Sequence, residues 1–471
     1  MRNAHIRYLC YPSVVCVGKE TEVTIFPRDP SRIFREEWEY ELAVVGLRED
    51  QLDYHDRIPL DHPYTVKDGC LHFTHLFDLE QEYSIRFCKK GEKEEKIALY
   101  AVEQDLYELR PLKGDLHAHT YYSDGQDGIS VTPADYREEG FDFFALTDHN
   151  RMYPSLLAAE QYKDIPLGIH ILSGEEVHTP GSIVHIVHVG GKESVSQKYI
   201  HQREEWEAEI DALAAAMPDV PEQYRRRVAM AKWACDTIHR AGGLAIFAHP
   251  FWCPNRYNVT AEFADLLFDA KIFDALEVVG CGAGKGRTNN QQLALWQEQA
   301  LKGNVIPAVG SSDSHNHDFD LGGFGKRFTV VCAKENTTEA ILDAIRKGYT
   351  LAAELPYESD NDVRFYGAPL RLVLFAHFLF EHYFNETWRL AVGEGILMRR
   401  YAQGEAVEKE LAALAPTVEN FYKAFYGITP APTLPKRTKD FLDHCLEVQR
   451  TLGPITKGSN LYIYGGNERR E

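Results

Sequence analysis

The stretch from Lys113 to Asn150 constrains the fold of this chain more than any other. It opens with KGDLHAHTYYSDG and closes with FDFFALTDHN, so two short apolar runs each end in a group of histidines and carboxylates. Side chains at the ends of neighbouring parallel strands meet at one edge of a sheet, where the active sites of α/β proteins are found. The stretch therefore predicts a metal site at such an edge, to which later strands contribute further ligands.

Strand-like and helical segments alternate from about residue 111 to about residue 355. Helices are expected at Pro133–Glu139, with Thr132 as N-cap, and at Thr338–Lys347. Seven or eight strand–helix units predict a closed parallel (β/α) barrel rather than an open sheet. The charged stretch 194–239 is too long for a barrel crossover, so we expect a helical insertion, either a lid over one end or a surface helical pair. The strand-like runs are GDLHAH, FDFFALTDH, HILSGEEV, IVHIVHVG, GLAIFAHP, ALEVVG, VIPAVGSSD and RFTVVCA.

The regions on either side of this α/β part differ from it in pattern. Residues 1–110 contain short runs that alternate apolar and polar residues between turns, which predicts an all-β, sandwich-like domain. Residues 356–471 are expected to be mostly helical, from Pro369 to Tyr426 and from Lys439 to Leu452. Aromatic residues crowd the first of these helical segments at mixed spacing. They indicate burial against the barrel or against another subunit, so a homo-oligomer formed through this region is one expectation.

Composition narrows the classes of function. Nine cysteines, without a CxxC pair, predict a reduced, cytoplasmic protein. The N-terminal residues do not form a signal peptide, and the apolar window 370–380 is too short to cross a bilayer. A net charge of −20 without a long basic tract argues against binding of extended nucleic acid. A small anion bound at a locally positive site stays compatible with this charge.

Candidate metal ligands recur along the chain. His117 and His119 lie two residues apart, so they face the same side of a strand. With 20 histidines in 471 residues, roughly one such pair is expected by chance. The context makes this pair significant, because the following strand-like runs also end in residues able to bind a metal. A buried histidine taken singly is more often a core residue than a ligand, but this succession indicates a metal cluster.

Two positions in this series have alternatives. Glu175 and Glu176 are neighbours on a strand and point to opposite faces, so only one of them can face the metals. His185 and His188 cannot both face inward without a β-bulge. The spacing after Gly174 favours Glu176, and His185 is the preferred histidine.

The ordered set HxH, Asp, Thr-Asp-His, Glu, His, Ala-His-Pro, Asp-x-His resembles the PHP (polymerase and histidinol phosphatase) family of metal-dependent phosphoesterases. The resemblance covers the middle half of the chain. It implies a distorted seven-stranded (β/α) barrel, the PHP barrel, with two to three divalent ions of zinc, manganese or iron. The GDLHAHTYYSDG motif and the additional β domain are most similar to the branch that includes carbaryl-type ester and carbamate hydrolases.

The resemblance also implies three metal positions. Glu176 bridges the first two of them. The first is held by His117, His119, Glu176 and Asp313, the second by Glu176, His185 and His249, and the third by Asp124, His149 and His315.

Such a site favours hydrolysis of an anionic substrate. Three carboxylates facing three dications leave a local charge of about +3. Zinc lowers the pKa of bound water to about 7, so a metal-bridging hydroxide can attack without a side-chain nucleophile. Asp313 or Asp148 is the candidate for moving the proton, beside the bridging Glu176. The glycine run GCGAGKGRT lacks the spacing of a P-loop. The cations proposed to hold a substrate anion are Lys285, Arg287 and Arg327.

The sequence therefore predicts a metal-dependent hydrolase that acts on a small anionic substrate, a phosphate ester. Two other classes stay open. One is a carboxyl-ester or carbamate hydrolase with the same metals, and the other is a metal-bearing binding module without turnover.

Overall fold

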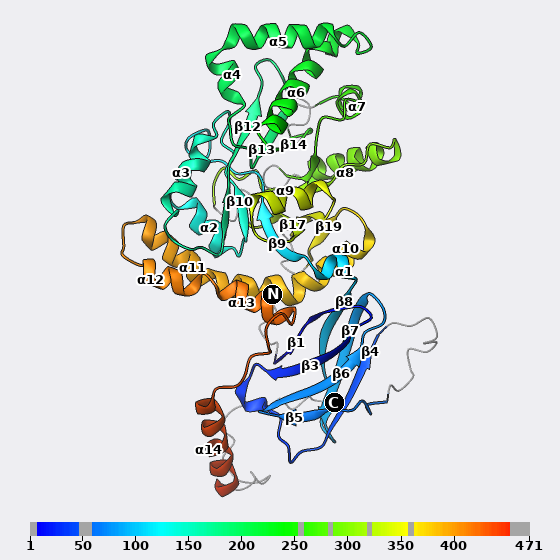
Figure 1. The fold of residues 1–471 in the computed structure, drawn as a ribbon, viewed down its shortest axis with the longest axis vertical. Helices are drawn as coiled ribbons and strands as arrows, with labels where there is room; N and C mark the ends of the chain where they lie inside the picture. Colours follow the sequence, from blue (N-terminus) through cyan, green and yellow to red (C-terminus); the bar gives the residue numbers. More distant parts are fainter. Residues whose placement is uncertain are drawn as a thin grey trace, which may run out of the picture.

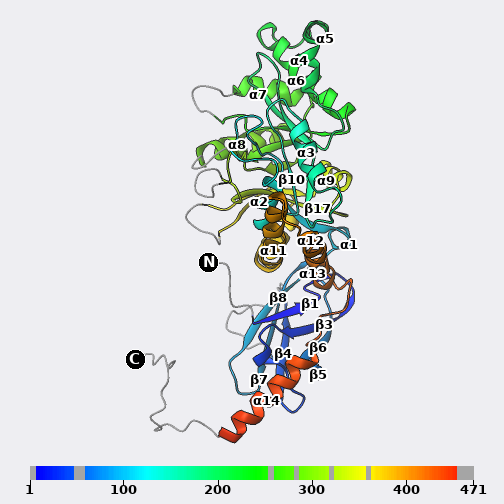
Figure 2. The same ribbon diagram turned by 90° about the vertical axis from the view of Figure 1, so that its left-hand side faces the viewer.

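Four sheets organise the chain in the computed structural model, which describes residues 7–46, 59–252, 259–280, 286–317, 323–356 and 362–452. Figure 1 shows a β region at one end of the long axis and an α/β region at the other. The helices α11 (Asn385–Ala402), α12 (Glu408–Leu414) and α13 (Thr417–Phe425) lie between these regions in both Figure 1 and Figure 2.

Two four-stranded sheets pack face to face in the N-terminal region. Val23 and Ile25 alternate with polar residues along one strand and are fully buried between the sheets, together with Leu71 and Ile85. The period of two therefore places one face of each strand in a shared core. The first sheet has the order β1 (Tyr8–Tyr11), β3 (Glu20–Pro27), β6 (Cys70–Leu76), β5 (Thr65–Lys67), and the second has the order β2 (Val14–Cys16), β8 (Glu95–Val102), β7 (Gln81–Lys89), β4 (Tyr40–Val45). A short 3-10 helix, η1, spans Pro30–Arg32.

The α/β region contains two mixed sheets. The six-stranded sheet has the order β11 (His170–Leu172), β10 (Phe143–Ala145), β9 (Arg110–Asp115), β17 (Arg327–Ala333), β18 (Thr350–Glu354), β19 (Arg364–Tyr366). The five-stranded sheet has the order β12 (Gly174–His178), β13 (His185–Val189), β14 (Leu244–Phe247), β15 (Ala275–Val279), β16 (Ala308–Gly310).

These sheets differ from the closed parallel barrel that the strand–helix alternation predicts. Strands β9 to β11 run parallel, as do β14 to β16, but β13 is antiparallel to both β12 and β14. Only residues 179–184 connect β12 to β13, and a parallel pair needs a crossover of a dozen or more residues. The described strands therefore form an α/β fold of two mixed sheets and no closed ring of paired strands.

Helices follow several strands of the α/β region. Helix α2 begins at Thr132 itself, with Val131 at the capping position, so the expectation that Thr132 caps the helix is wrong. The Thr132 hydroxyl instead donates a hydrogen bond to the carbonyl of Gly128 at 3.0 Å, as a threonine inside the first turn can do. The helices are α1 (Gln104–Tyr107), α2 (Thr132–Glu138), α3 (Tyr153–Gln161), α7 (Ala261–Asp269), α8 (Gly286–Leu301) and α9 (Thr338–Arg346).

The charged stretch after β13 forms three helices at the far end of the α/β region (Figure 1). They are α4 (Ser196–His201), α5 (Arg203–Ala215) and α6 (Glu222–Arg240). The indole of Trp206 is fully buried and packs edge-on against Trp233, with ring centroids 6.1 Å apart. These helices therefore share one apolar core with strands of the five-stranded sheet, among them Val177, Ile186 and Phe247.

The C-terminal helices pack onto the α/β region through buried polar and aromatic residues. Arg137 of α2 donates a hydrogen bond to the carboxylate of Glu394 in α11 at 2.6 Å, and both side chains are 1% exposed. Phe375, Phe378 and Tyr383 are buried in the core of this same chain. The remaining segments are α10 (Leu370–Leu379), the π-helix η2 (Phe380–Phe384) and α14 (Lys436–Leu452). Across the described part of the chain, no helix combines the length and the apolar character needed to cross a bilayer.

Candidate metal centre

The candidate ligands of the sequence meet where strands of both sheets end. Parallel strands present their carboxyl ends at a common edge, and β13, which runs antiparallel, presents its first residue there. For this reason His185, at the start of β13, joins residues that follow other strands. His117 and His119 follow β9, His149 follows β10, Glu176 belongs to β12, His249 follows β14, and Asp313 and His315 follow β16.

Glu176 lies at the centre of this group and is fully buried. Each carboxylate oxygen faces three histidine nitrogens, so this one residue links both halves of the cluster. Oε2 lies 2.7 Å from His149 Nδ1 and 3.4 Å from both His117 Nε2 and His119 Nε2, and Oε1 lies 2.9 Å from His185 Nδ1 and 3.2 Å from His178 Nε2 and His249 Nε2.

Asp313 closes the buried side of the cluster. Its Oδ1 lies 3.3 Å from Nε2 of His117 and 3.1 Å from Nε2 of His119. Asp313 has a φ of 50° and His249 a φ of 21°, a backbone region that non-glycine residues rarely adopt. Strained conformations of this kind are concentrated at functional sites, where the surrounding structure maintains them.

An outer group faces the solvent. Asp124 is 55% exposed at its side chain, and its two oxygens lie 3.4 Å from His315 Nε2 and 3.3 Å from His149 Nε2. His149 thus lies between Asp124 and Glu176. The exposed edge of the cluster is therefore the side from which a substrate can approach.

The charges of the cluster shift its pKa values in opposite directions. Burial lowers the pKa of His185 to about 4. Burial also opposes the charged form of His149, but the nearby carboxylates of Asp124 and Glu176 outweigh it and raise the pKa of His149 to about 10. In Glu176, burial is outweighed by the surrounding histidines, so its pKa lies well below the ordinary value. The carboxylates thus stay ionised and attract positive charge into a buried site.

The atoms at the centre of the cluster fit divalent metal ions. Imidazole and carboxylate are the ligands that zinc and related ions prefer. Several central atoms have no hydrogen-bond partner among the described residues, although they are buried, which is costly unless something else binds them. These atoms are His117 Nε2, His119 Nε2, His149 Nδ1, His178 Nε2, His185 Nδ1 and Glu176 Oε2. The compact groups that could hold an ion are His119, Asp124, His149 and His315; His117, His119 and Glu176; His117, His249 and Asp313; His149, Glu176 and His178; and Glu176, His185 and His249.

Glu175 and His188 lie outside these groups. Glu175 accepts a hydrogen bond from the Ser194 hydroxyl at 2.8 Å, and one of its oxygens lies 3.5 Å from His188 Nδ1. Both residues are fully buried on the opposite faces of their strands from Glu176 and His185. The alternation of strand side chains accounts for this separation.

Two residues that contact the cluster are absent from the sequence-based set. His178 follows Glu176 by two residues, a spacing that puts both side chains on one face of β12 and could have identified it. Glu277 lies in the apolar strand β15 and contacts His117 Nδ1 at 3.0 Å. Burying a single carboxylate in an otherwise apolar strand costs free energy, so this glutamate in the run ALEVVG could have been identified as a functional residue from the sequence.

The other predicted site residues lie elsewhere. Asp148 is fully buried and accepts hydrogen bonds from Thr120 N at 2.8 Å and from the Ser123 hydroxyl at 2.6 Å, so it holds the loop that carries Asp124. Arg287 is exposed at the start of α8, and Arg327 is buried with its Nε 3.5 Å from Glu354 Oε1. Neither arginine lines the cavity at the cluster. Lys285 lies outside the described residues.

A cavity of about 500 Å³ opens over the cluster. None of its lining residues comes from α4 to α6, so these helices do not form a lid over it in this structure. Its lining comprises Asp124, His149, Glu176, His178, Ser182, Ile183, His185, His249, Trp252, Asp313 and His315.

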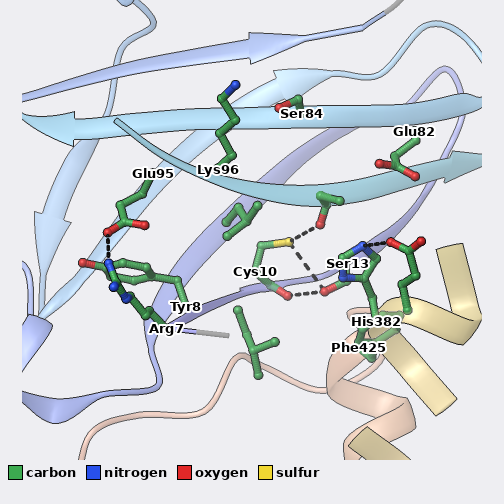
Figure 3. Close-up of a pocket in the computed structure, with 14 residues that line it drawn as sticks. Arg7, Tyr8, Cys10, Ser13, Glu82, Ser84, Glu95, Lys96, His382 and Phe425 are labelled. Atoms are coloured by element: carbon green, nitrogen blue, oxygen red, sulfur yellow. Dashed lines mark hydrogen bonds and ion pairs between the residues drawn. The ribbon is translucent and has the colours of Figure 1, made fainter. Parts of the chain in front are cut away.

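A second cavity, of about 650 Å³, lies between the sandwich and the C-terminal helices (Figure 3). Arg7 and Glu95 form an ion pair at 2.8 Å on one side of it, and His382 lies on the other side. None of the compact metal-binding groups found among the described residues includes a residue of this lining. The described residues that could bind a metal therefore gather at the cavity over Glu176.

Comparisons with known proteins return hydrolytic enzymes. No family model matches the sequence. The chain is 27% identical over 251 residues to a 5'-3' exoribonuclease of Haemophilus influenzae, and the match covers 41% of this chain and 88% of that protein. Among solved structures it is similar to a two-domain protein of Bacteroides vulgatus, described as containing a predicted PHP-like metal-dependent phosphoesterase. The TM-score is 0.35 at 20% identity, and the match covers 52% of this chain and 65% of that one.

Another similar structure is endonuclease Q in complex with a duplex substrate. Its TM-score is 0.33 at 18% identity, and the match covers 50% of this chain and 57% of that one. TM-scores below 0.5 are too low to carry a functional conclusion. The compact groups of potential metal ligands and the hydrolytic class of the Haemophilus relative are both consistent with one class, a metal-dependent hydrolase. The PHP-like phosphoesterases are also the family that the ordered motifs resemble.

Proposed function

We propose that this chain is a metal-dependent phosphoesterase of the PHP type, which hydrolyses a small anionic phosphate ester. The observation that carries the proposal is the convergence of the nine candidate ligands, from strand ends far apart in the sequence, around the buried carboxylate of Glu176. A buried carboxylate surrounded by histidines with unsatisfied nitrogens is a binding site for cations.

We propose three metal positions, as the resemblance to the PHP family implies. His117, His119, Glu176 and Asp313 would hold the first ion. Glu176 would also hold a second ion, together with His185 and His249. Asp124, His149 and His315 would hold the third. Divalent ions bound there would lower the pKa of a coordinated water and neutralise negative charge on a substrate.

The chain's own residues define where the substrate reacts. The buried wall of Glu176, His117 and Asp313 excludes water from one side, so the substrate enters at the exposed edge beside Asp124. Asp313 faces the cluster and is the better placed proton carrier, because Asp148 already accepts hydrogen bonds from Thr120 and Ser123.

The two sheets would together form a distorted PHP-type barrel. Backbone hydrogen bonds link them at the metal end, from His119 N to Ser314 O at 2.8 Å and from Asn150 N to Glu176 O at 2.8 Å. These links support a single barrel-like unit whose strands are not continuously paired.

A carboxyl-ester or carbamate hydrolase is the second candidate. It is favoured by the absence of lysine and arginine from the described residues that line the cavity, since a neutral ester needs no cation beyond the metals. Small substrates are proposed for both candidates, although the Haemophilus relative is an exoribonuclease and nucleic acid therefore belongs in the test.

The test is a substrate panel with metal-loaded protein. Purified full-length protein is supplied with manganese or zinc and assayed with p-nitrophenyl phosphate, bis-p-nitrophenyl phosphate, dinucleotides, a short RNA and aryl esters. We expect turnover of phosphate esters that chelation abolishes and metal restores. Turnover confined to neutral aryl esters would reject the phosphoesterase and support the second candidate.

A further inference from the structure

Glu277 contacts the metal cluster without facing the cavity. The residue lies in the middle of β15, and both its side chain and that of His117 are fully buried. Its Oε2 lies 3.0 Å from His117 Nδ1, whereas its side chain is absent from the lining of the cavity. Glu277 therefore contacts the cluster only through His117. It lies on the Nδ1 side of the imidazole ring, whereas Glu176 and Asp313 lie on the Nε2 side.

The surrounding chain is built to accommodate this carboxylate. Glu277 is flanked by the fully buried Leu276 and Val278, where a charge is costly without a partner. A Cβ added at Gly280 would lie 1.5 Å from Glu277 Oε1. Glycine at position 280 thus leaves the space that the carboxylate occupies.

The contact determines which nitrogen of His117 faces the cluster. An ionised carboxylate can only accept a hydrogen bond, so Nδ1 of His117 must donate it. In the neutral ring Nε2 then carries the lone pair. This Nε2 lies 3.4 Å from Glu176 Oε2 and 3.3 Å from Asp313 Oδ1, among the atoms that would share an ion.

We propose that Glu277 is a positioning residue that fixes His117 in the tautomer and orientation needed to bind the first metal ion. The proposal rests on the proposed function, because it requires the cluster to bind metal. A carboxylate behind a metal-binding histidine orients the ring and raises its basicity, and loss of such a partner typically costs about 10- to 100-fold in metal affinity.

The test measures zinc binding to metal-free full-length protein by isothermal titration calorimetry, together with zinc content after dialysis. Glu277→Gln keeps the size of the side chain but offers a weaker, neutral acceptor. Gly280→Ala keeps the carboxylate and displaces it. The matched control is Glu175→Gln, which alters the other buried glutamate–histidine pair, outside the cluster.

We expect Glu277→Gln and Gly280→Ala each to weaken zinc binding at one site by about 10- to 100-fold, while Glu175→Gln binds zinc as the wild type does. Excess zinc should restore hydrolysis by Glu277→Gln to nearly the wild-type kcat, an effect that damage to the fold would not show. If Glu277→Gln does not fold, Gly280→Ala decides the question by the same measurement.

Two outcomes would overturn the proposal and can be told apart. Unchanged zinc affinity in the folded variants, beside a wild type that binds zinc, would reject the role of Glu277 and leave the proposed function intact. A wild-type protein that binds no zinc, manganese or iron would reject the proposed function and this role with it.

Discussion

Replacing Glu176 by glutamine would remove one negative charge from the centre of the histidine cluster while keeping the size of the side chain. Both carboxylate oxygens of Glu176 lie within 3.4 Å of histidine nitrogens, so among the described residues Glu176 contacts the largest part of the cluster. The substitution therefore tests the metal centre at the point where the proposed first and second ions share a ligand.

The expected effect follows from the charge that is lost. One unit charge about 4 Å from another is worth about 4 kcal/mol at an effective dielectric constant of about 20. Since about 1.4 kcal/mol corresponds to a factor of ten and the proposed ions carry two charges, removing this carboxylate should weaken metal binding by at least about a thousandfold. Hydrolysis at micromolar metal should fall at least as far.

The neighbouring glutamate provides the control. Glu175→Gln makes the same chemical change one residue away, on the opposite face of β12, where the carboxylate is bonded to Ser194 and lies beside His188. Hydrogen bonds to charged groups contribute about 1.5–3 kcal/mol, so this variant should lose stability and keep metal affinity. Metal binding by calorimetry, metal content and urea unfolding would be measured for both variants.

The opposite pattern would refute the reasoning. If Glu176→Gln retained wild-type metal content and affinity, or if Glu175→Gln lost metal at full stability, the cluster around Glu176 would not be the metal site.

Five further predictions test other parts of the molecule. Asp313→Ala should abolish hydrolysis in the substrate panel without unfolding the protein, as monitored by circular dichroism, and full activity would contradict the assigned site. His178→Ala should weaken metal binding by about 10-fold in calorimetry, as expected for the loss of a ligand. Unchanged affinity would show that His178 only lines the cavity. At pH 8, metal addition should release protons, detected with a pH indicator, because the folded pKa values of His149 and His315 are raised to about 10 and about 9 by their carboxylate partners despite burial. These folded pKa values exceed the unfolded value of about 6.5, so the two protonated histidines stabilise the metal-free protein fully below about pH 6.5. This stabilisation is lost as the pH rises through about 9 to 10. The Tm of the metal-free protein should therefore fall between about pH 6.5 and about pH 10. Glu394→Ala removes the carboxylate 2.6 Å from the buried Arg137 and leaves it with Asp142 at 3.8 Å, so the free energy of unfolding in urea should fall by about 3 kcal/mol. Glu405→Ala, at the half-exposed ion pair with Arg400, should leave it unchanged.

The sequence by itself identified most of the residues that could bind metal. The pair His117 and His119, the Thr-Asp-His at the next strand end and the Asp-x-His that includes Asp313 are local patterns, readable because side-chain direction along a strand has a period of two. The same period allows only one of Glu175 and Glu176 to face the metals, the spacing after Gly174 favoured Glu176, and the structure places the two on opposite faces of β12. These features need only the chemistry of each residue and the geometry of its own strand.

Tertiary structure decided how those residues meet. The direction of β13 depends on the short connection from β12, and it is the pairing of β13 with both neighbours that brings His185 to the same edge as His249. The contact between Glu277 and His117 joins residues 160 positions apart. Sequence patterns report side-chain direction along one strand, whereas such contacts depend on the order in which strands pair, and that order is set by the packing of the whole chain.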